Sequence, residues 1–140
     1  MFRSFQRYWF TKTGLNIQYK NSQELGADRV ANAVGAIAHH PESNLIIVDL
    51  GSTTHFSVVT ASKYFLGGAI APGLETAARN LFERAALLKE AAFIVPKSAI
   101  GRDTQTNLQS GIMLGAIDVI DGMFRRILSE AGYDKTHNII

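Results

Sequence analysis

The chain has 140 residues, of which 46% are hydrophobic and 19% are charged, and its formal net charge at pH 7 is +2. This composition is typical of a globular domain and excludes an intrinsically disordered chain. The basic residues are scattered, so no nucleic-acid partner is expected. No stretch reaches the roughly 18 apolar residues of a membrane span, so no membrane partner is expected either. The sequence has no cysteine, which excludes disulfides and thiolate metal sites and fits a cytoplasmic protein.

The first ten residues carry aromatic side chains at helical spacing, namely Phe2, Phe5 and Trp9, with arginines between them. This pattern favours a packing helix or the remnant of an upstream domain. A helix lying on a membrane surface is the alternative. The segment lacks the continuous apolar stretch of a signal peptide.

The first long helical pattern runs from Glu24 to His40. Val30, Val34 and Ile37 recur at the spacing of one helix face, which predicts a single buried stripe. Pro41 marks the end of this helix.

Three short strands are predicted next. The apolar run 45–48 ends in Asp49 and is typical of a strand buried on both faces. A second strand is expected at about 55–60 and a third at 63–66. Their connections are short enough for hairpins, so the sequence predicts an antiparallel three-strand meander.

Glycine and proline mark the following segment, where Gly67-Gly68 and Pro72-Gly73 predict a loop. Apolar residues at helical spacing then predict a helix over 74–88. The segment 93–99 is expected to be extended, with Pro96 inside it.

A long helix is predicted from about Gln105 to Ala131, ended by Gly132. Gly111, Gly115 and Gly122 lie within it and cost about 1 kcal/mol each relative to alanine. We therefore expect another backbone to approach the helix closely there. Its apolar face is predicted to contain Ile112, Ala116, Val119, Met123 and Ile127.

The first cluster of potentially reactive residues lies at the start of the first helix. Gly26 would allow the backbone to turn or to approach a ligand, and Asp28 and Arg29 place a carboxylate beside a guanidinium. The alternative is that Asp28 is only a helix N-terminal charge, which the macrodipole favours.

The second cluster follows the first strand. Asp49 suits a hard cation, because such cations prefer oxygen ligands. Gly51 would allow backbone N–H groups to reach a phosphate, and the hydroxyls of residues 52–54 would add donors. A polar hairpin with ordinary turn-forming residues remains the alternative.

The third cluster, residues 100–104, precedes the long helix. Asp103 or Thr104 is a natural N-cap, and the free helix N-terminus could instead bind an anion. The four histidines have no metal-ligand spacing, so a histidine metal site is rejected.

These clusters occur together with further motifs in a fixed order: Thr13-Gly14-Leu15 through Tyr19 to Gly26-Ala27-Asp28-Arg29, then Asp49-Leu50-Gly51-Ser52-Thr53-Thr54, Leu66-Gly67-Gly68-Ala69-Ile70-Ala71-Pro72-Gly73, Ile100-Gly101-Arg102-Asp103-Thr104 and Ser110-Gly111. In this order they resemble the type III pantothenate kinases over nearly all of the chain after residue 10.

The resemblance implies an α/β fold of the sugar kinase and actin-like ATPase superfamily, built from two ribonuclease H-like halves. Residues 1–40 would be a remnant of the N-terminal half with its substrate-side helix. Residues 41–140 would be an incomplete C-terminal half, containing the antiparallel meander and flanking helices. The resemblance also implies ATP-dependent phosphorylation of pantothenate to 4'-phosphopantothenate, the first step of coenzyme A biosynthesis. Mg²⁺, a monovalent cation (K⁺ or NH₄⁺) and a homodimer are expected with it.

The substrate-side residues follow from the same resemblance. Asp28 matches the catalytic base, and Gly26, Ala27, Asp28 and Arg29 form the pantothenate-binding segment. Tyr19 falls at the family's substrate-contacting tyrosine. Arg29 is placed to hold the substrate's carboxylate.

The remaining roles concern the cation, ATP and the dimer. Asp49 matches the potassium ligand, and Ser52 stands where the family usually has an ATP-contacting threonine. Thr104 matches a threonine that reaches substrate in the dimer. His55 replaces a usual threonine, and Ser57 stands where many members have an aspartate.

Two segments of the family's pattern are not found in this sequence. Members begin with a strand and a glycine turn that hold the ATP phosphates, and they continue into a Gly-Gly turn that holds the adenosine. Residues 138–140 look like the opening of a strand. We therefore expect a chain truncated at both ends. The alternative to an active kinase is a non-catalytic remnant that acts in pantothenate binding, in dimerisation or as a regulatory accessory module.

Overall fold

The computed structural model describes residues 13–85, 90–133 and 137–139. The aromatic pattern of residues 1–10 lies outside this part of the chain. The described residues form two compact units. The first contains those of 1–49, 55–70 and 132–140, and the second contains those of 50–54 and 71–131.

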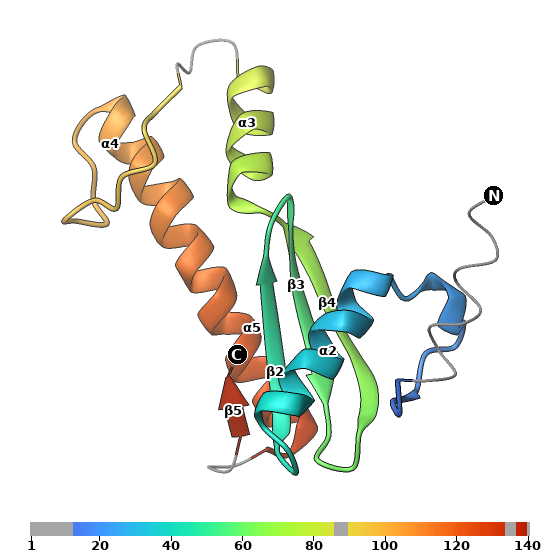
Figure 1. The fold of residues 1–140 in the computed structure, drawn as a ribbon. Coiled ribbons are helices and arrows are strands. Elements are labelled where there is room, and N and C mark those ends of the chain that lie inside the picture. Colours follow the sequence, from blue (N-terminus) through green and yellow to red (C-terminus); the bar gives the residue numbers. More distant parts are fainter. Residues whose placement is uncertain (1–12, 86–89, 134–136, 140) are drawn as a thin grey trace, which may run out of the picture. The chain divides into compact units, whose positions relative to one another are not determined.

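A five-stranded mixed sheet has the strand order β1-β4-β3-β2-β5 (Figure 1). The predicted meander is present as β2 (Asn44–Leu50), β3 (Thr53–Val59) and β4 (Tyr64–Pro72). Successive neighbours joined by such short turns must run antiparallel. β1 (Asn16–Ile17) pairs parallel with β4, and β5 (His137–Ile139) pairs parallel with β2. The expected C-terminal strand is therefore confirmed over His137–Ile139.

The helix α2 (Ala27–His39) packs on one face of this sheet (Figure 1). A short 3₁₀ turn, η1 (Ser22–Glu24), precedes it, so the α-helix begins three residues later than Glu24. The shared core consists of Leu15, Leu25, Val30, Ala33, Ala36, Leu45, Ile47, Val59 and Phe65.

The buried face of α2 differs from the predicted stripe. Val30 is buried and Ile37 packs against the core, but Val34 is 36% exposed. Arg29, which the apolar pattern could not include, is only 5% exposed. The small side chains of Ala33 and Ala36 supply the rest of the contact, because they let the helix lie close to the sheet.

The predicted loop at Gly67-Gly68 is wrong, because both glycines lie inside β4. Gly67 has φ +133° and Gly68 has φ +158°. A Cβ on Gly68 would stand 1.7 Å from the carbonyl oxygen of Phe56 on the neighbouring strand. Glycine is needed here because of a close approach between strands, which the turn statistics of glycine do not distinguish from a loop.

The second unit contains three further helical elements and an irregular segment. α3 (Leu74–Arg84) begins at the Pro72-Gly73 turn, as predicted, and buries Ala78. Leu88 lies outside the described residues, and Leu81 is 40% exposed. The segment 93–99, which was predicted to be extended, forms neither a helix nor a strand.

The predicted long helix is present in three parts: α4 (Thr104–Gln109), the π-helical turn η2 (Ser110–Leu114) and α5 (Gly115–Ala131). Gly132, with φ +64°, follows its end as predicted. Two side chains at the π-turn bind the irregular segment: Gln109 Nε2 donates to the oxygen of Ala92 (3.3 Å) and Ser110 Oγ to that of Ala99 (2.6 Å).

The expectation for the helix glycines is not met within the described chain. A Cβ at Gly111, Gly115 or Gly122 would meet no atom within 4 Å. The expected apolar face is also incompletely covered, since α5 has no buried residue and Val119 is 48% exposed. Among the described helices, none is long and apolar enough to cross a membrane.

Candidate active site

Gly26 and Asp28 meet at the start of α2. Gly26 is the N-cap, and Asp28 lies in the first helical turn with an exposed side chain. A Cβ on Gly26 would stand 2.3 Å from Asp28 Oδ1, so the carboxylate folds back over the glycine. The N-terminal end of the helix dipole favours a negative charge at this place. The carboxylate thus stays exposed to a ligand while it lies beside the first backbone groups of the helix.

Arg29 points away from Asp28 into the first unit. Its Nε donates to Ser57 Oγ (3.1 Å), Nη1 to the Tyr19 hydroxyl (2.9 Å) and Nη2 to the Phe56 carbonyl oxygen (3.2 Å). The structure therefore brings Tyr19 and Arg29 together. It does not join Arg29 to Asp28 in an ion pair, although the two are adjacent in the sequence.

Close packing of glycine and aromatic rings encloses this guanidinium. Arg29 Cζ lies 5.4 Å from the ring centre of Phe65 and 5.9 Å from that of Tyr19. The two rings are 6.0 Å apart and tilted by 57°. A Cβ on Gly68 would come within 3.1 Å of Arg29 Nη2. The buried charge thus lies over both rings, whose faces attract cations.

Asp49 lies on β2 two residues after Ile47, the last buried residue of the strand, and is partly exposed. Its Oδ2 accepts a hydrogen bond from Asn32 Nδ2 of α2 at 3.0 Å. Oδ1 has no hydrogen-bond donor among the described residues, so one carboxylate oxygen is left for a cation. The described residues contain no group of three or more histidine and acidic side chains that could hold a metal ion. Asp49 could therefore supply one oxygen ligand, and carbonyl or water oxygens would have to complete the shell.

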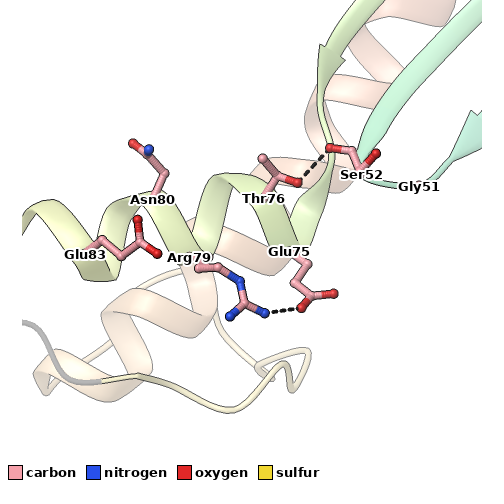
Figure 2. A pocket seen from close by; sticks show the side chains of 7 residues that line it. All are labelled: Gly51, Ser52, Glu75, Thr76, Arg79, Asn80 and Glu83. Carbon is pink, nitrogen blue, oxygen red and sulfur yellow. Dashed lines mark hydrogen bonds and ion pairs between the residues drawn. The ribbon is translucent and has the colours of Figure 1, made fainter.

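Ser52 lies at the turn between β2 and β3, on the wall of an open cavity of about 430 Å³ (Figure 2). The rest of the lining comes from Gly51, Glu75, Thr76, Arg79, Asn80 and Glu83. Arg79 and Glu75 form an ion pair along α3, and the pKa of Arg79 is raised mainly by its hydrogen bond to Glu75. The Ser52 side chain is exposed, and its hydroxyl has no partner among the described residues.

The backbone of this turn is less available than the sequence predicts. The N–H of Gly51 donates to the carbonyl oxygen of Thr53 (3.0 Å), so it closes the hairpin and does not face a ligand. A Cβ on Gly73 would stand 2.0 Å from the carbonyl oxygen of Gly51. The glycine of the Pro72-Gly73 pair is thus required because α3 starts directly against the turn.

Thr104 is the first residue of α4 and is exposed. Asp103 is the N-cap, and its Oδ1 accepts from the backbone N–H of Thr106 at 2.8 Å. This hydrogen bond is the main cause that lowers the pKa of Asp103. Of the two capping candidates, the structure selects Asp103 and leaves the Thr104 hydroxyl free to act elsewhere. No hydrogen bond in the described chain links Thr104 to Ser52.

Two residues at these sites escaped the sequence reasoning. Asn32 follows Asp28 by one helical turn and bonds Asp49, and Thr76 bonds the Ser52 carbonyl oxygen (2.7 Å). Polar residues on a helix surface carry no signal of such partners. The only available signal was position, since both side chains lie on helices that start next to a glycine-containing motif.

The sequence profile of the family described as type III pantothenate kinase matches residues 3–126. The chain belongs to this family. A protein named type III pantothenate kinase from Brevibacillus brevis is 44% identical over 125 residues, which cover 89% of this chain and 49% of that relative. The chain thus spans about half the length of this curated relative.

A solved structure supports the fold. The crystal structure titled as a conserved putative Baf family transcriptional activator from Campylobacter jejuni superposes with a TM-score of 0.58 and 24% sequence identity. The match covers 79% of this chain and 50% of that chain. At this identity the likeness concerns the fold alone.

Proposed function

We propose that this protein transfers the γ-phosphoryl group of ATP to pantothenate and forms 4'-phosphopantothenate, the first step of coenzyme A biosynthesis. The proposal rests on one observation. The chain belongs to this family, and its Gly26-Ala27-Asp28-Arg29 segment lies at the start of α2. Its carboxylate is exposed at the helix start, and its guanidinium is buried and bonded to Tyr19.

Asp28 is the proposed catalytic base. Phosphoryl transfer depends mainly on positioning and charge stabilisation. The carboxylate therefore needs only to orient the pantothenate hydroxyl and accept its proton. The place of Asp28 in the first turn of α2 leaves both tasks possible. Gly26, Ala27, Arg29 and Tyr19 form the rest of the proposed pantothenate site.

ATP, with Mg²⁺, is the proposed phosphoryl donor. The exposed Ser52 hydroxyl on the wall of the cavity suits a hydrogen bond to a phosphate oxygen (Figure 2). Bound Mg²⁺ would neutralise phosphate charge. Asp49 is the proposed ligand of a monovalent cation, K⁺ or NH₄⁺, through the oxygen that Asn32 does not occupy.

We further propose a cytoplasmic homodimer in which Thr104 reaches the substrate of the partner subunit. The exposed position of Thr104 at the start of α4 leaves it available for this contact. The finer fold assignment is the ribonuclease H-like fold of actin-like ATPases. It is supported by an antiparallel meander with the parallel strand β5 beside its first strand. The division into an N-terminal remnant (1–40) and an incomplete C-terminal half (41–140) belongs to the same proposal.

Turnover in a coupled assay with ATP, Mg²⁺, K⁺ and pantothenate tests the function. We expect pantothenate-dependent ADP formation, and a loss of about 10²–10⁴-fold in kcat for Asp28→Asn. Asp118→Asn is the matched control, because Asp118 is an exposed carboxylate in the first turn of α5. It should leave kcat unchanged.

Failure of the wild-type chain to form ADP, together with an absence of ATP binding in calorimetry, would contradict the kinase function for this chain. The cation role has its own readout. Asp49→Asn should raise the K⁺ concentration needed for half-maximal rate, while replacement of K⁺ by Na⁺ should lower the wild-type rate.

A further inference from the structure

Asn32 joins α2 to β2 through one side-chain contact. Its Nδ2 donates a hydrogen bond of 3.0 Å to Asp49 Oδ2, 17 residues later in the chain. Asparagine is a poor residue for the interior of a helix, and the Asn32 side chain is exposed, so neither helix propensity nor burial accounts for it. The hydrogen bond to Asp49 is the interaction that this side chain makes in the described part of the protein.

The chemistry of the two groups fixes the orientation of the amide. An ionised carboxylate only accepts hydrogen bonds, so Asn32 must turn its NH₂ group, and not its carbonyl, toward Asp49. This bond occupies Oδ2, and no donor among the described residues engages Oδ1. Rotation of the carboxylate about its χ2 angle would break the bond. The Asp49 carboxylate is therefore held in one orientation with one oxygen left for a ligand.

The partner that holds Asp49 is uncharged. Ion pairs among the described residues lie within α3 and α5 and do not include Asp49. A lysine or arginine in place of Asn32 would neutralise the carboxylate and compete with a bound cation. An amide orients the carboxylate and leaves its whole negative charge available to a cation.

The helix face that holds Asp49 is also the face of the proposed base. Asn32 follows Asp28 by four residues on α2, and residues at this spacing lie on the same side of a helix. Both side chains are exposed, and all three residues belong to the first compact unit. One face of α2 thus presents the proposed base and fixes the proposed cation ligand.

We propose that Asn32 is a positioning residue of the cation site, which holds the Asp49 carboxylate ready for a monovalent cation and restricts it to one ligand oxygen, Oδ1. The inference rests on the role of Asp49 in the proposed function. Because the carboxylate is oriented before the cation arrives, binding need not restrict its rotation, and the affinity is higher than that of a freely rotating carboxylate.

The first test measures K⁺ binding by thermal unfolding, without ATP or pantothenate. KCl replaces choline chloride at constant ionic strength, and the rise of Tm with K⁺ concentration gives the dissociation constant. We expect Asp49→Asn to abolish the K⁺-specific rise. Asn32→Leu, which keeps the size of the side chain but removes the donor, should raise the dissociation constant about 5-fold, the effect of one hydrogen bond.

Ala31→Leu is the matched control. Ala31 is also exposed on α2, so this variant adds the same apolar side chain to the same helix and keeps the Asn32 amide. It should bind K⁺ as wild type does. Leucine is a better helix former than asparagine, so Asn32→Leu carries little risk to folding.

The coupled assay supplies the second readout. Asn32→Leu should raise the K⁺ concentration for half-maximal rate about 5-fold, in parallel with the dissociation constant. At saturating K⁺ its kcat should stay within about twofold of wild type, because the base Asp28 is unchanged. A purely structural role of Asn32 would instead lower Tm equally at every K⁺ concentration.

An unchanged K⁺ dissociation constant in Asn32→Leu would overturn the inference. If Asp49→Asn still abolished the K⁺ effect, the proposed cation role of Asp49 would stand. Absence of any K⁺-specific stabilisation in wild type would contradict both. Binding of K⁺ with the expected loss in Asn32→Leu, but without turnover of pantothenate, would contradict the kinase function and leave the inference intact.

Discussion

Thr76 Oγ1 on α3 donates a 2.7 Å hydrogen bond to the carbonyl oxygen of Ser52, 24 residues earlier in the chain (Figure 2). The N–H of Gly73 donates to the same oxygen at 3.0 Å. Two donors from the start of one helix therefore hold the turn that carries the proposed ATP-contacting hydroxyl. The Ser52 carbonyl is fully engaged, and only the side chain is left for a ligand.

We predict that Thr76→Val raises the KM for ATP and leaves the KM for pantothenate unchanged. Valine has nearly the shape of threonine but lacks the hydroxyl, so the turn loses one of its two anchors at a cost of about 1 kcal/mol. If the whole of this cost falls on ATP binding, the KM for ATP rises about 5-fold. Thr76→Ser keeps the hydroxyl and should restore most of the affinity. Steady-state kinetics against each substrate provides the measurement, and a parallel rise in both KM values would refute a local effect.

Gly68→Ala should be strongly destabilising, by about 3 kcal/mol. The added Cβ would lie 1.7 Å from the Phe56 carbonyl oxygen, a backbone atom that cannot rotate away, and φ is +158°. The same oxygen accepts from Arg29 Nη2, so the shift should also disturb the Tyr19 contact. Urea unfolding gives the change in the free energy of unfolding.

The control for this substitution is Gly122→Ala in α5. A Cβ there meets no atom within 4 Å, and alanine is favoured over glycine in a helix interior by about 1 kcal/mol. Gly122→Ala should therefore stabilise the protein slightly. Equal effects of the two substitutions would show that the close approach at Gly68 does not limit the fold.

The sequence predicted the elements whose signals are local. The apolar run before Asp49, the short hairpin connections and the helix-stopping Gly132 each depend on neighbouring residues, and all three are present. Gly67-Gly68 were misassigned, because glycine serves both turns and close strand contacts. Local sequence contains no information that separates these two uses.

The candidate site was predicted as a set of positions and not as a set of contacts. Asp28 and Arg29 are neighbours in sequence, yet the 100° step of a helix sends one to solvent and the other into the core. The partners of Arg29, above all Ser57, are 10 to 28 residues away. Only the pairing of strands and the packing of α2 on them create this network.

The capping box of α4 makes its start sensitive to acid. The pKa of the Asp103 carboxyl is lowered below its usual 3.8, mainly because the backbone N–H of Thr106 donates to it. A lowered folded-state pKa contributes stability that is present above the unfolded value and lost as the pH falls through the folded value. We predict that amide exchange in the first turn of α4 accelerates below about pH 4 in wild type.

Asp103→Asn retains a side-chain oxygen that can cap the helix but cannot titrate. Its exchange rates, corrected for intrinsic pH dependence, should be constant across the same range. Asp103→Ala removes the cap and should show fast exchange at every pH. A wild-type profile as flat as that of Asp103→Asn would exclude the carboxylate as the source of the acid sensitivity.

Tyr133, after the end of α5, has a buried hydroxyl oxygen with no hydrogen-bond partner in the described chain. An unsatisfied buried hydroxyl costs about 1 kcal/mol or more, so Tyr133→Phe should raise the free energy of unfolding by about this amount at pH 7. Burial also raises the pKa of Tyr133 above its usual 10.0. A raised pKa gives stability that is complete below the unfolded value and lost as the pH rises through the folded value.

The difference in the free energy of unfolding between Tyr133→Phe and wild type should therefore grow above about pH 10. There the wild type is destabilised, because it must either keep the phenol neutral or bury the phenolate. Urea unfolding at pH 7 and at about pH 10.5 measures both effects, with Tyr64→Phe as the exposed control that should change neither. If Tyr133→Phe instead destabilises the protein at pH 7, the hydroxyl must have a partner, such as a bound water, that offsets its burial. In that case the stability advantage of Tyr133→Phe above about pH 10 should also be absent, because the same partner would stabilise the ionised oxygen.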